Sequence, residues 1–335
     1  MQTETSCHTT TKPEYLKREI AALDHVRVIA VFVILLCHYF LFSDLNSGVG
    51  RYFAGIGNMM FFLVSALLYG LKYPIGGQAM DYKRFAARRV AKIGASVWPF
   101  LIIIVALYLV FGVEFSWIDV GLNFVFLGYL GELPGNEHLW FLTVLAACYV
   151  EIMLLKRLNA GNQIVPWALL GVSTLLVIVG ERLGIPSGAF LTLGLYAFVF
   201  LRSDWFLKKS KTMKLWMAIA IVVINIACFV LEFNGLFVRS RSLHFVFTGL
   251  CGLSLLALLL RYVPDKSNKV IPFLCGISFE IYLVHHTLCA GPFFSVTQWP
   301  CTHVGNFCLL IVLSIVFAFM LKIIVKALRL GRDAN

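Results

Sequence analysis

The sequence predicts an all-α fold, a polytopic membrane helical bundle of about ten transmembrane helices with one re-entrant or interfacial segment. Hydrophobic residues make up 60% of the chain and charged residues 13%, against roughly 45–50% and 25% in soluble domains. The mean hydropathy is +0.87, and long apolar runs recur along the chain. Because a helix satisfies its backbone hydrogen bonds within one segment, apolar runs of this length indicate membrane helices.

Apolar runs bounded by polar loops define the expected spans. Several are short for a hydrocarbon core of about 30 Å, so they favour a thin or locally deformed membrane. A cytosolic N-terminal segment (1–24), a transmembrane domain (25–321) and a cytosolic tail (322–335) are expected. The expected spans are 25–43, 53–71, 93–112, 139–155, 165–180, 188–201, 215–231, 243–260, 270–290 and 305–321.

The net charge of +11 is distributed as a topology signal. With a cytosolic N-terminus, 23 of the 28 Lys and Arg fall in inner segments and four in outer segments. Loops on the cytosolic side of membrane proteins are enriched in Lys and Arg. The split therefore predicts that both termini lie in the cytosol, and it removes the reason to expect a nucleic-acid partner.

Residues 120–130 are apolar but do not fit the pattern of spans. About eleven residues are too few to cross a bilayer. Counting them as a span would also invert the charge distribution of every later loop. We therefore expect a re-entrant or interfacial element joined to the polar loop 131–137, which makes this segment a candidate wall of a substrate site.

The nine cysteines indicate neither a disulfide framework nor a metal site. Their number is odd, most lie within apolar runs, and the sequence contains no CxxC or zinc-type spacing. We therefore interpret them mainly as small hydrophobic residues, and no metal ligands are expected.

Arg27 and His38 are the two ionisable residues of the first expected span that most need an explanation. The ten residues between them carry no formal charge. A step of eleven residues at about 100° each returns to within roughly 20° of the starting azimuth, about 16 Å along the axis. Because lipid would penalise both groups, they are expected to face a protein interior or an aqueous cavity. The alternative is an arginine extending to the cytosolic edge and a histidine satisfied within the bundle.

This spacing resembles the first helix of the acyltransferase family 3 membrane proteins, whose marker is an arginine, ten residues and a histidine. Residues 61–70 resemble that family's second helix, with Ser65 matching its serine, although a contact between small residues of two helices would also explain them. Residues 138–149 resemble its His-Leu-Trp-Phe-Leu stretch through His138 and Trp140. Interfacial aromatic residues are the alternative for that stretch.

A basic segment, residues 85–93, resembles the family's motif at the start of the third helix. Arg88 and Arg89 match it, and Lys92 stands where a third arginine is expected. An ordinary positive flank of a membrane helix is the alternative. Six basic residues against one acidic residue in this loop favour an anion site instead, and arginine is well suited to phosphate.

Residues 276–285 resemble a late helix of the family. Ser278, Tyr282 and His285 match its pattern, and Glu280 lies inside the apolar run. A carboxylate at membrane depth is a functional candidate. The alternative is a structural partner for a neighbouring arginine or hydroxyl group.

One acidic position of the family's pattern is missing. Many members carry a carboxylate a few residues after the His-Leu-Trp-Phe-Leu stretch, where this chain has Leu145 and Ala146. If that carboxylate matters in relatives, Glu151 or Glu280 is expected to replace it here.

The resemblance implies an enzyme of the bacterial inner membrane. It would transfer an acyl group, with acetyl the expected one, from cytosolic acyl-CoA to a hydroxyl of a cell-surface glycan or its lipid-linked precursor. The resemblance implies no bound cofactor, because acyl-CoA is a co-substrate. Membrane lipid is expected to surround the protein. His38 is the expected base, since an unperturbed histidine titrates near 6.5. Arg27 and Glu280 complete the expected catalytic set, and Arg88, Arg89 and Lys92 would bind the donor.

Two other classes of protein remain open at this point. A secondary transporter or flippase would also use intramembrane Arg, His and Glu, although the sequence has no paired halves with matching broken helices. A non-catalytic lipid-binding scaffold would explain the basic loops but not His38. An acyl-transfer assay separates the three classes.

Overall fold

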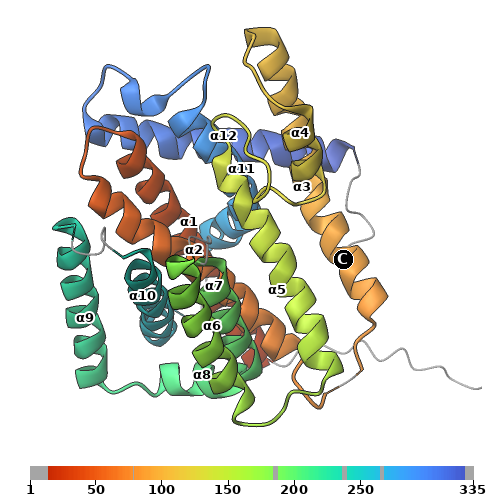
Figure 1. The fold of residues 1–335 in the computed structure, drawn as a ribbon, viewed down its shortest axis with the longest axis vertical. Coiled ribbons are helices and arrows are strands. Elements are labelled where there is room, and N and C mark those ends of the chain that lie inside the picture. The colour runs from red at the N-terminus through yellow and green to blue at the C-terminus, as the bar shows by residue number, and fades with distance from the viewer. Residues whose placement is uncertain (1–13, 78, 184–187, 236–239, 265–267, 329–335) are drawn as a thin grey trace, which may run out of the picture.

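The computed structural model describes residues 14–77, 79–183, 188–235, 240–264 and 268–328. These residues form a bundle of α-helices with two short 3-10 turns and contain no strand (Figure 1). The prediction of an all-α membrane fold is confirmed.

Nine helices in the described ranges are long and apolar enough to cross a membrane, by length and composition. The nine comprise α1 (Glu14–Phe42, apolar from Ala21), α2 (Ser47–Lys72), α3 (Tyr82–Phe111), α5 (Trp140–Arg157, preceded by the 3-10 turn η1, Glu137–Leu139), α6 (Val165–Arg182), α9 (Leu215–Phe233), α10 (Arg241–Tyr262), α11 (Val270–Ala290) and α12 (His303–Ala327). Five of them match expected spans to within two residues at each end, while the other four, α1, α2, α3 and α12, extend 6 to 11 residues further at one end.

The tenth expected span, residues 188–201, forms α7 (Gly188–Leu201). At 14 residues, this helix is about 21 Å long and too short to cross by itself. It continues through an 82° bend into α8 (Ser203–Lys211), a lysine-rich helix, so the pair counts at most as one broken span. Nearly all of the second half of α7 is buried. The apolar run therefore reflects packing within the bundle as much as contact with lipid.

The segment at 120–130 does not form a spanning helix. Its first half belongs to α4 (Trp117–Phe124), and the rest is a series of turns. Trp117, Ile118 and Val125 are each more than 60% exposed. An apolar surface beside polar loops is typical of an interfacial element, in agreement with the prediction.

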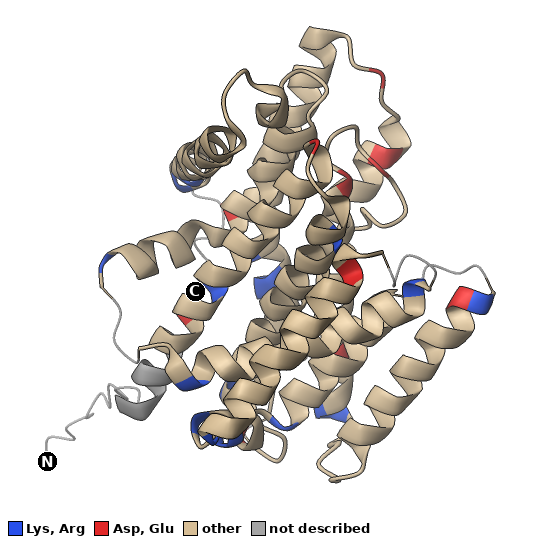
Figure 2. Cartoon of the chain, turned by 90° about the vertical axis from the view of Figure 1, so that its left-hand side faces the viewer, with Lys and Arg blue, Asp and Glu red and all other residues tan. Residues whose placement is uncertain are grey.

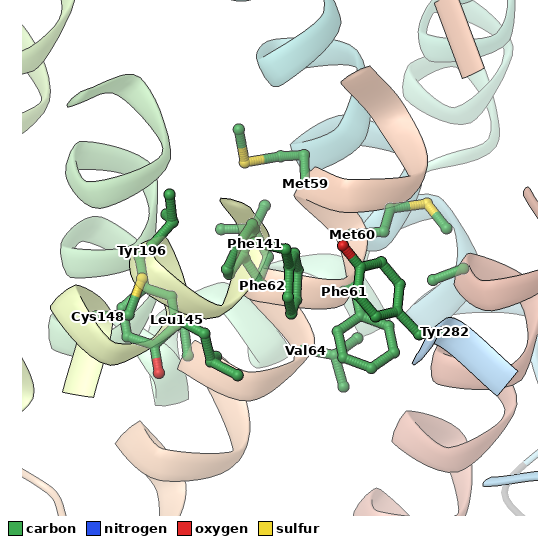
Figure 3. Close-up of a cluster of buried hydrophobic side chains, with 14 of the residues drawn as sticks. Met59, Met60, Phe61, Phe62, Val64, Phe141, Leu145, Cys148, Tyr196 and Tyr282 are labelled. Atoms are coloured by element: carbon green, nitrogen blue, oxygen red, sulfur yellow. The ribbon is translucent and has the colours of Figure 1, made fainter. Parts of the chain in front are cut away.

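Two helices, α2 and α11, form the interior of the bundle. In each, 67% of the most apolar stretch is buried, whereas α6 and α9 are 17% and 22% buried and lie at the periphery. Figure 3 shows the aromatic side chains that pack around α2: Phe62 and Phe141 are stacked 4.3 Å apart, and Tyr282 lies 4.6 Å from Phe141. This cluster joins α2, α5 and α11, and α11 carries His285 and His286 of the site below.

The charged residues divide between the two ends of the molecule. Figure 2 shows more Lys and Arg in the lower half and more Asp and Glu in the upper half, with some of each kind in both. The lower end holds the α2–α3, α5–α6 and α8–α9 connections, and the upper end holds α4 and the α1–α2 connection (Figure 1). The loops thus alternate between ends as the charge pattern predicts. We call these the basic end and the acidic end.

We expect residues 113–138 to lie on one side of the membrane. Cysteines introduced at Glu114 and Glu137 should then react with an impermeant maleimide from the same side, because α4 does not cross. Lys83→Cys at the basic end is the control that should react only from the other side. Native Cys301 and Cys308 are exposed and must be replaced with serine first. Opposite sidedness of Glu114→Cys and Glu137→Cys would show that the segment crosses.

Candidate active site

Helix α1 presents Arg27 and His38 to the same neighbouring helix. The Arg27 guanidinium lies 3.6 Å from the Cys275 thiol, and the His38 ring lies 3.0 Å from that of His285. Both partners belong to α11. The structure therefore places the two residues on one stripe of the helix, facing protein, as their spacing predicts.

Four histidine rings gather where α1, α5 and α11 approach the acidic end. The centroids of the His38 ring and the rings of His285 and His286 are 4.8 Å apart in each case. His138 stacks on His286 at 4.6 Å and lies 5.4 Å from His285. All four are at most 9% exposed. We call this group the histidine cluster.

Hydrogen-bond partners assign the protons of the His38–His285 pair. His285 Nδ1 lies 2.7 Å from the Tyr282 carbonyl, and His38 Nδ1 lies 3.0 Å from the Ile34 carbonyl. Because a carbonyl only accepts, both Nδ1 atoms carry the proton. His285 Nε2 therefore accepts from His38 Nδ1 at 3.0 Å. The lone pair of His38 Nε2 remains available.

Hydrogen bonds hold the loop before α5 against α11, next to the His38–His285 pair. The Tyr282 hydroxyl donates to the His138 carbonyl at 2.7 Å, and His138 Nε2 lies 3.2 Å from the Leu283 carbonyl. Further along, the Thr287 hydroxyl donates to Asn136 Oδ1 at 2.7 Å. These bonds satisfy polar groups that lipid would leave unpaired. They join the two motif segments, 138–149 and 276–285, to each other.

Two adjoining cavities open from the histidine cluster. The first, here the histidine cavity, has a volume of about 290 Å³; the second, here the outer cavity, about 690 Å³. The histidine cavity is lined by His38, Leu41, Phe42, Gly128, Tyr129, Glu132, Glu137, His138, Trp140 and His286. The outer cavity is lined by Phe42, Glu137, His286, Cys289, Ala290, Gly291, Pro292, Phe293, Ser295, Thr297 and Gln298.

The connection between α4 and η1 supplies one wall of the histidine cavity. Thr143 donates to the Phe126 carbonyl at 2.9 Å and accepts from the Tyr129 backbone at 3.0 Å, which holds the turns against α5. Partial burial raises the pKa of the Tyr129 hydroxyl, so it stays protonated and can donate. The segment is therefore part of a cavity wall, as the sequence suggests.

A second constellation lies toward the basic end. Lys92 of α3 interacts electrostatically with Arg89, Arg27, Lys322 and Lys72, which come from α3, α1, α12 and α2. We call these five residues the cationic cluster. A bound anion would relieve the repulsion between these like charges. The cluster is therefore a candidate anion site.

Within the cationic cluster, the Arg89 side chain packs against two aromatic rings. Its guanidinium donates to the Tyr69 hydroxyl and lies 5.3 Å and 5.5 Å from the Tyr69 and Phe85 rings. The contact with Tyr69 joins Arg89 to α2, whereas Arg88, the other expected donor-binding arginine, lies about 100° further round α3.

The structure places Glu280 apart from the histidine cluster. Its Oε1 accepts from Ser96 at 2.8 Å and from Lys322 at 2.9 Å, and its side chain is 2% exposed. These partners fit the structural alternative considered for this residue. Glu151, the other carboxylate considered, has a buried oxygen for which no partner is found in the described residues.

Three further expected residues, Ser65, Ser278 and Trp140, lie away from the His38–His285 pair or line a cavity. Ser65 lies 3.2 Å from the Tyr196 hydroxyl, and Ser278 donates to the Cys275 carbonyl of its own helix at 2.9 Å. Trp140 lines the histidine cavity. Only Trp140 of these three meets a cavity described above.

Sequence reasoning missed His286, Glu137 and Glu132, which line the cavities, and the contributions of Lys72 and Lys322 to the cationic cluster. His286 directly follows His285, so the pair was a signal that matching to the family pattern passed over. No pattern in the sequence predicts that Lys322 of α12 pairs with Glu280 of α11 and interacts electrostatically with Lys92 of α3. In the described part of the chain, no set of three or more His, Cys, Asp or Glu is arranged to hold a metal ion.

Fold and site together define a polytopic membrane protein built around buried histidines. The family model described as "Acyltransferase domain" matches residues 20–323, and the chain belongs to this family, acyltransferase family 3. It is thus a membrane acyltransferase. Comparison with curated proteins and with solved structures finds no match.

Glu280→Gln should affect stability more than chemistry. The amide still accepts from Ser96, and Lys322, 47% exposed, stays hydrated once its partner is neutral. We expect a loss on the order of 1 kcal/mol, seen as a lower Tm in detergent. The acyl-transfer kcat should stay within about threefold of the parent, because general acid–base groups are typically worth 10²-fold or more. A kcat loss of that size at unchanged Tm would make Glu280 catalytic.

Proposed function

We propose that this protein transfers an acyl group, with acetyl the expected one, from acyl-CoA to a hydroxyl of a cell-surface glycan or its lipid-linked precursor. The observation that carries the proposal is the His38–His285 pair. It leaves the His38 Nε2 lone pair at a cavity large enough for the reacting groups. A neutral histidine oriented by a second group is the arrangement that general-base catalysis requires.

The reaction then follows from this geometry. His38 Nε2 takes the proton of the acceptor hydroxyl while the oxygen attacks the thioester carbonyl. Collapse of the tetrahedral intermediate breaks the carbon–sulfur bond, and the proton held by His38 passes to the departing CoA thiolate. His285 Nε2, which accepts from His38 Nδ1, stabilises the imidazolium formed in between.

The cationic cluster would bind the phosphates of the donor. Its five positive charges come from four helices, and Glu280 neutralises only Lys322. Arg27 belongs to this cluster, so it would contact the donor rather than the acceptor. The pantetheine arm would extend from here toward His38, about 16 Å along α1.

The charge pattern supports an orientation in the bacterial inner membrane. The basic end would face the cytosol, where acyl-CoA is found, and both termini would lie on that side. The acidic end, with both cavities, would face the opposite side. Acceptor and donor would thus reach the protein from different faces.

His38→Ala should abolish acyl transfer while the protein remains folded and inserted. Loss of a general base typically costs on the order of 10²–10⁴ in rate. The measurement is CoA release and acylated product formed by purified protein, with Tm as the folding control. Near-normal turnover would make His38 a structural residue. A transporter or scaffold would release no CoA in the parent either, which would refute the proposed function as a whole.

Replacing Arg88 and Arg89 together with alanine should mainly weaken donor binding. Each charge-assisted hydrogen bond is worth roughly 1.5–3 kcal/mol, so the KM for acyl-CoA should rise tenfold or more. The kcat should change much less, because the contact is shared by ground state and transition state. Binding should also depend less steeply on salt than in the parent.

Single variants divide this effect between the two residues. Arg89→Ala should account for most of it, since the Arg89 guanidinium is held in place by Tyr69 and Phe85. Arg84→Ala, near the exposed start of α3, is the matched control. Unchanged acyl-CoA affinity in the double variant would leave these arginines as topology signals.

A further inference from the structure

His286 occupies the junction of the two cavities. It is 3% exposed, lies between the stacked ring of His138 and Phe42, and lines both cavities. Its Nδ1 lies 3.0 Å from the Gly135 carbonyl and 3.6 Å from Glu137 Oε2. Both neighbours accept, so Nδ1 carries the proton. Nε2 therefore keeps a lone pair, for which the described residues offer no hydrogen-bond donor.

The outer cavity has the chemistry of a site for an uncharged polar molecule. Phe42 and Phe293 supply apolar surface, and Gln298 supplies an amide. Ser295 and Thr297 are hydrogen-bonded to each other at 2.8 Å, and Ser295 also donates to the Cys289 carbonyl at 2.6 Å. A few polar groups on a partly apolar wall are typical of pockets that orient a small polar ligand.

Charge restricts the occupant further. Neither cavity is lined by Lys or Arg, and each is lined by carboxylates: Glu137 in both and Glu132 in the histidine cavity. Figure 2 shows that this end of the molecule carries Asp and Glu more widely. An anionic ligand would be repelled by these charges with nothing to pair with.

We propose that the outer cavity is the acceptor subsite, that it takes an uncharged sugar and discriminates against acidic ones, and that His286 Nε2 accepts a hydrogen bond from a sugar hydroxyl. This inference rests on the proposed function and deepens it. The rings of His286 and His38 are 4.8 Å apart, so one sugar can place one hydroxyl at His286 and a neighbouring hydroxyl at His38. His286 then positions the acceptor, and His38 removes its proton.

Three methyl glycosides test the charge selectivity with purified protein and saturating acetyl-CoA. Methyl glucoside is neutral, methyl glucuronide replaces its C6 hydroxymethyl with a carboxylate, and methyl xyloside lacks C6 altogether. Xyloside and glucoside should both be acylated. The kcat/KM for glucuronide should be about fivefold or more below that for xyloside, as expected for one unpaired charge near carboxylates in water. Added salt and the double variant E132Q/E137Q should narrow the difference.

Two variants of His286 test the contact itself. His286→Ala should raise the KM for the sugar about tenfold, the value of one hydrogen bond to a buried group, with acetyl-CoA binding unchanged. His286→Gln offers an amide oxygen close to the position of Nε2 and should restore much of the affinity. His303→Ala, an exposed histidine that lines neither cavity, is the matched control and should behave as the parent does.

The possible failures are distinguishable. Equal use of glucuronide and xyloside by the parent would overturn the charge selectivity. An unchanged sugar KM in His286→Ala would overturn its role. Hydrolysis of acetyl-CoA that depends on His38 but yields no acylated sugar would overturn the class of acceptor. Neither hydrolysis nor transfer with any acceptor would refute the proposed function itself.

Discussion

The hydrogen bond from His38 Nδ1 to His285 Nε2 is the interaction on which the site depends. Each ring is also held by a carbonyl of its own helix, Ile34 for His38 and Tyr282 for His285. Their orientations are therefore set by the helical backbone, and only the packing of α1 against α11 brings them to 3.0 Å. Any change that shifts one helix against the other misaligns the base, even if it lies far from the cavity.

The need to pair polar groups explains how the loop before α5 packs over the histidine cluster. In a membrane bundle, an unpaired backbone or side-chain polar group costs several kcal/mol, so an irregular loop at this depth needs partners. Asn136 and His138 find them on α11, where they meet Thr287, Leu283 and Tyr282. The loop is thus part of the rigid bundle, and its bonds to α11 fix the walls of the cavity.

How much the sequence predicted depends on whether the deciding contact lies within one helix. The stripe of Arg27 and His38 needs only the helical repeat, and the spans need only apolar length. Glu280 and Lys322 lie 42 residues apart in the chain, on α11 and α12, and no pattern in the sequence specifies that they pair. The same holds for Arg88 and Arg89: adjacent residues lie about 100° apart on the helix, and only the packing of α3 against α2 brings Arg89 to Tyr69. The apolar run at 188–201 predicts a span, but it does not reveal how much of α7 is buried, because a buried helix and a lipid-facing one are equally apolar.

In the proposed reaction, the distance between the two clusters also protects the thioester. The cationic cluster would hold the highly charged part of acyl-CoA at the basic end, while its acyl group would react about 16 Å along α1 among residues at most 9% exposed. Water competes with the acceptor for the thioester, so an acceptor that fills the cavity beside His38 favours transfer over hydrolysis. The charged part of CoA then need not cross the membrane, because only the acyl group passes to the acceptor at the acidic end.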